Sequence, residues 1–222
     1  MEEKTVIIKE SLISTKNLVK TFNKVDVLKG LNIDFNKGDR IALIGQNGAG
    51  KTTLIRCILG QYTYEGKLVV MNFNPRKDHE VLMQHIGFIP QTPPPLQMTV
   101  GEMLDFFSKL SNTDKEEFVK IGVDMGLDVE ANLAKPFLKL SGGMKQKLLV
   151  ALALGRKPEI LLMDEPSANL DPAARKVFFK YLEEYNNDAL MIISSHRLKE
   201  LENLATRLVE MDMGVVVVDN EL

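Results

Sequence analysis

Gly-Gln-Asn-Gly-Ala-Gly-Lys-Thr, residues 45–52, is the stretch that decides the fold of this chain. It has the spacing G-x-x-x-x-G-K-[ST], and it lies between an apolar, strand-like run at 40–44 and a helical pattern at 51–59. In that context the glycines let successive backbone N–H groups point at phosphate oxygens, and the dipole of the following helix favours anions. The stretch predicts a nucleoside triphosphate site in which Lys51 reaches the β- and γ-phosphates and Thr52 holds Mg²⁺.

The composition limits what kind of protein surrounds this loop. The chain has 222 residues, enough for one sizeable core with at most a small subdomain. With 28 basic and 30 acidic residues the net charge is −2, so we expect no nucleic-acid partner. The single cysteine, Cys57, excludes an internal disulfide framework and any multi-cysteine metal site.

The apolar runs indicate a cytoplasmic protein. None of them approaches the roughly 18 residues that a membrane-spanning helix needs. The start of the chain, residues 1–9, has mixed charge in place of the long apolar region of a signal peptide. Any role at a membrane would therefore require another subunit.

Short β-type segments occur on both sides of the loop. Two of them, at 15–22 and 27–35, are separated by a polar turn and predict a small antiparallel element. Strands that alternate with helices predict a mostly parallel sheet, with ligands at the carboxyl ends of its strands. Besides 40–44, further strands are expected at 67–71, 86–89, 159–163 and 189–194.

Helical patterns fill much of the second half. Between residues 100 and 133 apolar side chains recur at helical spacing with no strand between them, which predicts a helical subdomain. A later helix, from Pro172 to about Asn186, has Asp171 as its N-cap. The apolar faces expected in the subdomain are Met103, Leu104, Phe107 and Leu110 on one helix, and Phe118, Ile121 and Met125 on the next.

Two carboxylates end an apolar strand. Residues 160–163 are apolar, and Asp164 and Glu165 follow them at the ligand edge of the expected sheet. Asp164 is suited to bind Mg²⁺ directly or through water, and Glu165 can polarise a water for in-line attack on a γ-phosphate. The alternative is an acidic strand end before a turn at Pro166.

Ser141, Gly142 and Gly143 begin another apolar-periodic helix. Two glycines at a helix start cost stability, about 1 kcal/mol each relative to Ala in a helix interior and less in a first turn. A backbone exposed at a helix N-terminus is a second phosphate cradle. The alternative is that Ser141 only caps the helix and the glycines only form a turn. The spacing alone favours neither interpretation.

Taken in order, these motifs resemble those of the nucleotide-binding subunits of ATP-binding-cassette transporters over about residues 14–218. Five stretches besides the phosphate loop match the family pattern. They are the signature Leu-Ser-Gly-Gly at 140–146, the Walker B strand with its catalytic glutamate at 160–165, the D-loop at 167–171, the Q-loop at Gln91 and the switch histidine at Ser195 and His196.

This resemblance implies an α/β fold, that of a P-loop NTPase with a mostly parallel sheet core, a small N-terminal antiparallel β element and a helical subdomain. Residues 1–222 would form one ATPase domain. The β element and a RecA-like core would occupy 14–90 and 155–218, and a helical signature subdomain about 91–154.

The resemblance also implies ATP and Mg²⁺ as cofactors and a head-to-tail dimer with a second copy or a paralogous subunit. Each ATP would lie between the phosphate loop of one subunit and Ser141–Gly143 of the other. Glu165 would activate the water, His196 would contact the γ-phosphate, and Gln91 would couple Mg²⁺ to the partner subunit. Asp171 would act across the dimer, although its capping role alone accounts for an Asp there.

Phe22 lies where the family usually carries an aromatic that stacks on adenine. The residues expected to bind nucleotide are Phe22, Gly45, Gln46, Asn47, Gly48, Ala49, Gly50, Lys51, Thr52, Thr53, Gln91, Ser141, Gly142 and Gly143. The expected metal ligands are Thr52, Gln91 and Asp164. The expected catalytic residues are Glu165, His196 and Lys51.

The function that these motifs imply is to power a separate transmembrane permease by ATP-driven dimerisation, with the ATPase peripheral on the cytoplasmic face. The permease would dock between the core and the helical subdomain, near residues 91–100. The alternative is a soluble cassette ATPase that acts on a ribosomal or other partner. Such relatives usually carry two cassettes or a long coiled coil, and this sequence has neither. An unrelated P-loop enzyme would leave the signature unexplained.

Within the family the chain resembles the ATPases of drug, polysaccharide and cofactor-maturation exporters. The features that suggest this are its single-cassette length, the helix start at 99–102 and a Glu-rich helix expected at 197–204 after the switch histidine. A solute importer is also compatible with these features.

Overall fold

The computed structural model describes residues 10–196 and 198–222. The expectation about a signal peptide rests on residues 1–9, and the expected helix at 197–204 begins at Arg197. Residues 1–9 and Arg197 lie outside the described part of the chain.

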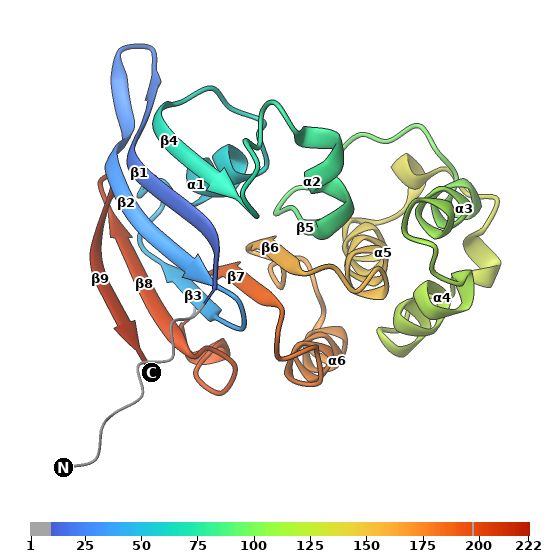
Figure 1. The fold of residues 1–222 in the computed structure, drawn as a ribbon. Coiled ribbons are helices and arrows are strands. Elements are labelled where there is room, and N and C mark those ends of the chain that lie inside the picture. The colour runs from blue at the N-terminus through green and yellow to red at the C-terminus, as the bar shows by residue number, and fades with distance from the viewer. Residues whose placement is uncertain (1–9, 197) are drawn as a thin grey trace.

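A six-stranded sheet forms the centre of the molecule (Figure 1). Its order is β5-β6-β7-β3-β8-β9, and every neighbouring pair is parallel except the edge pair of β8 and β9. The mostly parallel sheet is thus confirmed. Its strands are β3 (Arg40–Ile44), β5 (Ile86–Ile89), β6 (Ile160–Asp164), β7 (Leu190–Ser194), β8 (Arg207–Asp212) and β9 (Val215–Glu221).

A second sheet of three antiparallel strands confirms the predicted N-terminal element, with the order β2-β1-β4. Asn23 and Lys24 form the hairpin turn at φ 49° and 67°, a left-handed backbone that suits the tight turns of hairpins. The first two strands are longer than the sequence indicates. The bounds are β1 (Ser11–Phe22), β2 (Val25–Asn36) and β4 (Glu65–Val70).

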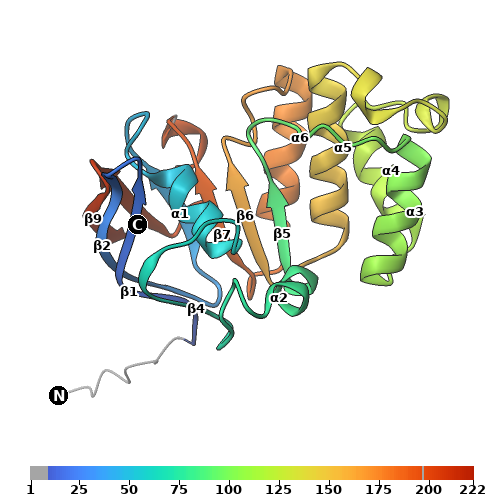
Figure 2. The same ribbon diagram turned by 90° about the horizontal axis from the view of Figure 1, so that it is seen from above.

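Helices cover both faces of the central sheet (Figure 2). Helix α1 (Lys51–Ile58) lies between the two sheets, whereas α5 (Gly142–Gly155) and α6 (Pro172–Glu183) cover the other face. Alternate residues of β6 therefore enter different cores: Ile160 and Leu162 pack on the α1 side, and Leu161 and Met163 on the α5 and α6 side. Burial on both faces explains why this strand is a continuous apolar run.

A third core lies away from the sheet, where α3 (Val100–Ser111) and α4 (Lys115–Asp124) pack with α5. Helix α5 is apolar nearly all round because it joins two cores. Its Leu148 and Leu152 pack with α3 and α4, while Ala151 and Leu154 pack beneath the sheet. The helix that starts at Ser141 is thereby fixed to both parts of the molecule.

Several elements differ from the sequence expectations. The expected helix at 197–204 is wrong over its described part, where η3 (Leu198–Glu200) is a single short 3₁₀ turn. Leu110 was expected in an apolar face, but it is 45% exposed. The elements that the sequence did not reveal are α2 (His79–His85), β8, β9, and the 3₁₀ turns η1 (Glu130–Asn132) and η2 (Phe137–Lys139).

Gly155, at the end of α5, is required by close packing. A Cβ at this position would overlap the ring of the fully buried Phe118 on α4. Gly155→Ala should therefore destabilise the protein by about 1–3 kcal/mol, the usual cost of overpacking a core, as measured by urea denaturation. Gly142→Ala is the control, because the Cβ it would add has no neighbour within 4 Å apart from adjacent residues and the backbone of its own helix. Equal stability of the two variants would contradict this account.

Candidate functional site

The phosphate loop connects the end of β3 to the start of α1. Gly45, its first residue, has φ 142°, and a Cβ there would overlap the carbonyl oxygen of Met211 on β8. A side chain at this position would push the loop away from the sheet. The glycine thus lets the loop turn directly above the strand ends.

Lys51 is only 7% exposed although it carries a charge. Its Nζ donates hydrogen bonds to the backbone carbonyls of Gly45, at 2.6 Å, and Gln46, at 3.1 Å. Because carbonyls are neutral, these two bonds orient the ammonium without cancelling its charge. A positive charge is therefore held inside the loop, where an anionic ligand would meet it.

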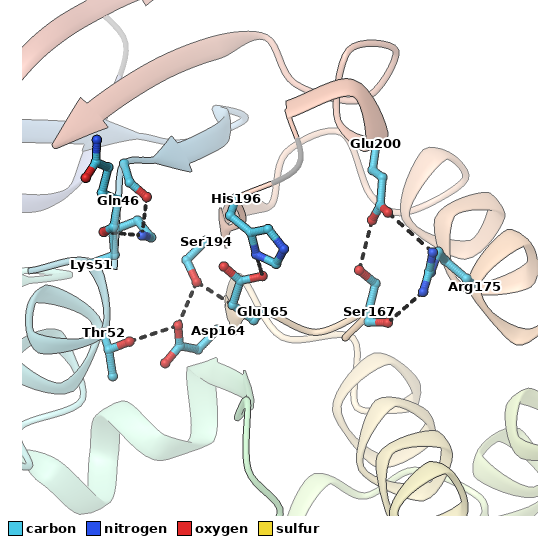
Figure 3. Close-up of polar contacts among 11 residues, drawn as sticks. Gln46, Lys51, Thr52, Asp164, Glu165, Ser167, Arg175, Ser194, His196 and Glu200 are labelled. Atoms are coloured by element: carbon cyan, nitrogen blue, oxygen red, sulfur yellow. Dashed lines mark hydrogen bonds and ion pairs between the residues drawn. The ribbon is translucent and has the colours of Figure 1, made fainter. Parts of the chain in front are cut away.

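Asp164, at the end of β6, is 3% exposed and joins two neighbouring segments (Figure 3). Its Oδ1 accepts hydrogen bonds from Oγ1 of Thr52, at 3.1 Å, and from Oγ of Ser194, at 2.6 Å. The predicted metal ligands Thr52 and Asp164 are therefore in direct contact. Ser194 was not predicted; its only sequence signal is a hydroxyl at the end of an apolar strand.

Glu165 and His196 also meet, as Figure 3 shows. Nδ1 of His196 lies 2.9 Å from Oε2 of Glu165. An ionised carboxylate only accepts hydrogen bonds, so Nδ1 carries the hydrogen in this pair. The carboxylate is largely buried, with its side chain 12% exposed, whereas the imidazole is 55% exposed.

A cavity of about 350 Å³ opens beside these groups. It gathers most of the predicted phosphate-binding and metal-binding residues, together with Val27 of β2, which was not predicted. Of the described site residues, Phe22, Gly45, Gln46, His196 and Ser141–Gly143 are not part of its wall. The lining residues are Val27, Asn47, Gly48, Ala49, Gly50, Lys51, Thr52, Thr53, Gln91, Asp164 and Glu165.

Gln146, on α5, links the loops around the cavity. It is fully buried, and its Nε2 donates to the carbonyls of Pro166, at 3.0 Å, and Pro90, at 3.4 Å. The side chain of Asn169 adds a hydrogen bond to the carbonyl of Gln91, at 3.2 Å. No short sequence pattern predicts these contacts, because the partners are backbone groups far away in the chain.

Ser141 caps α5, since its Oγ accepts a hydrogen bond from the N–H of Met144 at 3.2 Å. Ser141 is therefore the N-cap, whereas Gly142 and Gly143 lie in the helix itself instead of in a turn. The phosphate cradle stays a prediction. Asp171 caps α6 as predicted, because it accepts from the N–H of Ala174 at 3.0 Å. That hydrogen bond, together with an ion pair to Lys147 of α5, lowers the pKa of the Asp171 carboxyl.

Phe22 ends β1 and is 37% exposed. Its ring meets the edge of Tyr62, with centroids 5.1 Å apart, and the ammonium of Lys20 lies 4.4 Å from its centroid. The ring is therefore held by Lys20 of β1 and by Tyr62, which precedes β4. Its proposed contact with adenine stays a prediction.

The site and the fold can be compared with known proteins. A family profile described as "ABC transporter" matches residues 28–168. The chain belongs to the ABC transporter family. As a member of this family it is an ATP-binding subunit that hydrolyses ATP to energise transport, and the predicted family, fold class and function are confirmed.

Individual relatives agree with this assignment. The chain is 29% identical to the phosphate import ATP-binding protein PstB 1 of Enterococcus faecalis, over 89% of this chain and 85% of that one. It is 30% identical to the linearmycin resistance ATP-binding protein LnrL of Bacillus subtilis, over 93% and 68%. A solved structure described as an ATP-binding subunit of an ABC transporter superposes with a TM-score of 0.84 at 26% identity, over 96% and 90%.

The two named relatives differ in what they are named for, one in import and the other in resistance, yet this chain is about equally similar to both. The similarity thus follows the ATP-binding cassette and not the cargo. No helix in the described ranges is long and apolar enough to cross a membrane.

Lys51→Ala should weaken ATP binding by about tenfold or more, because a charge-assisted contact is worth about 1.5–3 kcal/mol. Isothermal titration with ATP measures this loss. Lys109→Ala is the matched control, because Lys109 lies exposed on α3, away from the cavity. Equal affinities of the two variants would exclude a phosphate contact by Lys51.

Proposed function

We propose that two such cassettes bind ATP head to tail, each nucleotide lying between the phosphate loop of one chain and Ser141–Gly143 of the other. The observation that carries this proposal is the position of the signature, which stands outside the cavity of its own chain. Ser141 and Gly142 are exposed at the N-terminus of α5, and the space beside Gly142 is open. A second copy or a paralogous subunit can therefore reach them.

The proposal includes a division of the chain into two parts. Residues 1–222 form one ATPase domain, in which about 91–154 carries the signature and 14–90 with 155–218 carries the phosphate loop. The separate apolar core of α3, α4 and α5 supports this division. The buried contacts of Gln146 link the two parts.

The chemistry at the cavity follows from the contacts. Glu165 is placed to accept a proton from the attacking water, because its carboxylate lies at the cavity wall and is held by His196. Lys51 binds the β- and γ-phosphates. His196 contacts the γ-phosphate when ATP is bound.

Mg²⁺ fits the same wall. The oxygen atoms of Thr52 and Asp164 converge there, and Gln91 lines the same cavity. One hydroxyl and one carboxylate, completed by phosphate oxygens and water, is a usual magnesium environment. Bound there, Mg²⁺ would neutralise charge on the phosphates.

The partner that uses this ATPase is a transmembrane permease, which would hold the chain at the cytoplasmic face of the membrane. Docking near residues 91–100 is supported by an adjacent cavity of about 560 Å³ between α3 and α4. Leu104, Val119 and Val123 give this cavity apolar walls, and charged residues such as Lys115 and Glu116 also line it. An apolar surface with a polar rim is suited to a protein partner.

Glu165→Gln should abolish turnover yet preserve ATP binding, because the amide cannot take the proton from water. The variant should accumulate as an ATP-bound dimer, measured by gel filtration with ATP alongside phosphate release. Glu183→Gln, which removes the same charge from an exposed residue of α6, should behave as wild type. Unchanged turnover in Glu165→Gln would rule out the role assigned to this carboxylate.

Ser141→Arg should abolish hydrolysis by blocking the cradle that the partner chain uses. Mixing Ser141→Arg chains with Lys51→Ala chains should restore activity, because each mixed dimer contains one site with both parts intact. Random pairing into two-fold dimers predicts recovery to at most about a quarter of the wild-type rate. If each ATP site belonged to a single chain, mixing would restore nothing.

A further inference from the structure

A second polar network lies behind the cavity and joins the D-loop to the segment that follows His196 (Figure 3). Oγ of Ser167 donates a hydrogen bond to Oε2 of Glu200 at 2.9 Å. The guanidinium of Arg175, on α6, lies 3.4 Å from Oε1 of the same carboxylate. Glu200 therefore receives one partner from the D-loop and another from the helix that the D-loop enters.

Arg175 completes the connection from its other side. Its Nη2 is within 3.5 Å of the carbonyl of Ser167 and 3.3 Å of the carbonyl of Leu170. The side chains of Glu200 and Arg175 are 19% and 27% exposed, so the pair is largely shielded from water. A shielded ion pair with additional hydrogen bonds holds its geometry better than an exposed one.

The residues of this network follow closely in the chain on Glu165 and His196. Ser167 follows Glu165 by two residues, and Glu200 follows His196 by four. The chain segments that leave β6 and β7 are thus joined twice, once at the cavity and once behind it.

The imidazole of His196 needs such support from elsewhere. Its side chain is 55% exposed, so packing alone does not fix it, and the 3₁₀ turn η3 that follows is a single turn. Beyond it, Leu198 packs against the core beneath the sheet, Glu200 joins the polar network, and Leu201 and Leu204 are buried. Among these, only the Glu200 network links the segment to the D-loop next to Glu165.

We propose that Glu200 is a positioning residue for ATP hydrolysis: by clamping the segment after His196 to Ser167 and Arg175, it holds the imidazole against Glu165. The inference rests on the proposed roles of Glu165 and His196. Glu200 itself is not part of the cavity wall.

The first test is the kinetics of Glu200→Gln, which keeps the size of the side chain and removes its charge. A small displacement of a reacting group costs about ten- to a hundredfold in rate, so kcat should fall within that range while the affinity for ATP stays unchanged. Ser167→Ala removes the other bond of the clamp and should lower kcat in the same way. The matched control is Glu202→Gln, the same change on an exposed residue two positions along.

The second test observes His196 directly and does not depend on turnover. The chain has 3 histidines, so ¹⁵N-histidine labelling gives few imidazole signals, and His79 and His85 act as internal references. Glu165→Ala, which removes the acceptor, supplies the shift that marks loss of the contact. In Glu200→Gln and Ser167→Ala the His196 signals should move towards that value, whereas in Glu202→Gln they should stay in place.

The outcomes separate this inference from the function on which it rests. If Glu200→Gln leaves the His196 signals unchanged, or lowers ATP affinity together with kcat, Glu200 is not a positioning residue. If His196→Ala itself retains full turnover, the proposed site fails instead. A fall in kcat with a matching shift of His196, in the two clamp variants but not in Glu202→Gln, supports the clamp.

Discussion

The buried carboxylate of Asp164 is the contact on which the rest of the site depends. One of its oxygens accepts hydrogen bonds from Thr52, at the start of α1, and from Ser194, at the end of β7. Parallel strand pairing brings these ends to one edge of the sheet, and the two hydroxyls then set their spacing. A buried carboxylate costs several kcal/mol to desolvate unless it is bonded in this way. The phosphate loop and the strand that Glu165 directly follows are thus joined through a single group.

A small number of contacts, made by helix α5, also connects the helical part to the sheet. Helix α5 places apolar side chains in two cores, and its buried Gln146 bonds to the carbonyls of Pro90 and Pro166. Lys147, the next residue, pairs with Asp171 at the start of α6. The helix that presents the signature therefore cannot shift without moving the loops at the cavity. In a subunit whose ATP energises transport, such coupling links nucleotide contacts to the helical part of the molecule.

The sequence predicted the parts of the site that are local, and it missed those that are made by distant contacts. The phosphate loop, the strand with Asp164 and the cap at Asp171 are each specified by a few adjacent residues, so their patterns are readable. Ser194 and Gln146 act through partners far away in the chain, which no short pattern encodes. The expected helix at 197–204 failed because its apolar spacing serves the two buried leucines Leu201 and Leu204 without a continuous helix.

The backbone of Glu165 has an unfavourable left-handed conformation that its neighbours stabilise. Glu165 has φ 47°, a left-handed geometry that costs a residue with a Cβ about 1 kcal/mol or more. Its N–H lies 3.1 Å from both the carbonyl and the hydroxyl of Ser194, so the turn is held by two acceptors of one residue. The residue in this turn lines the cavity. Because Ser194 also bonds Asp164, the residue that stabilises this turn is the one that positions the neighbouring carboxylate.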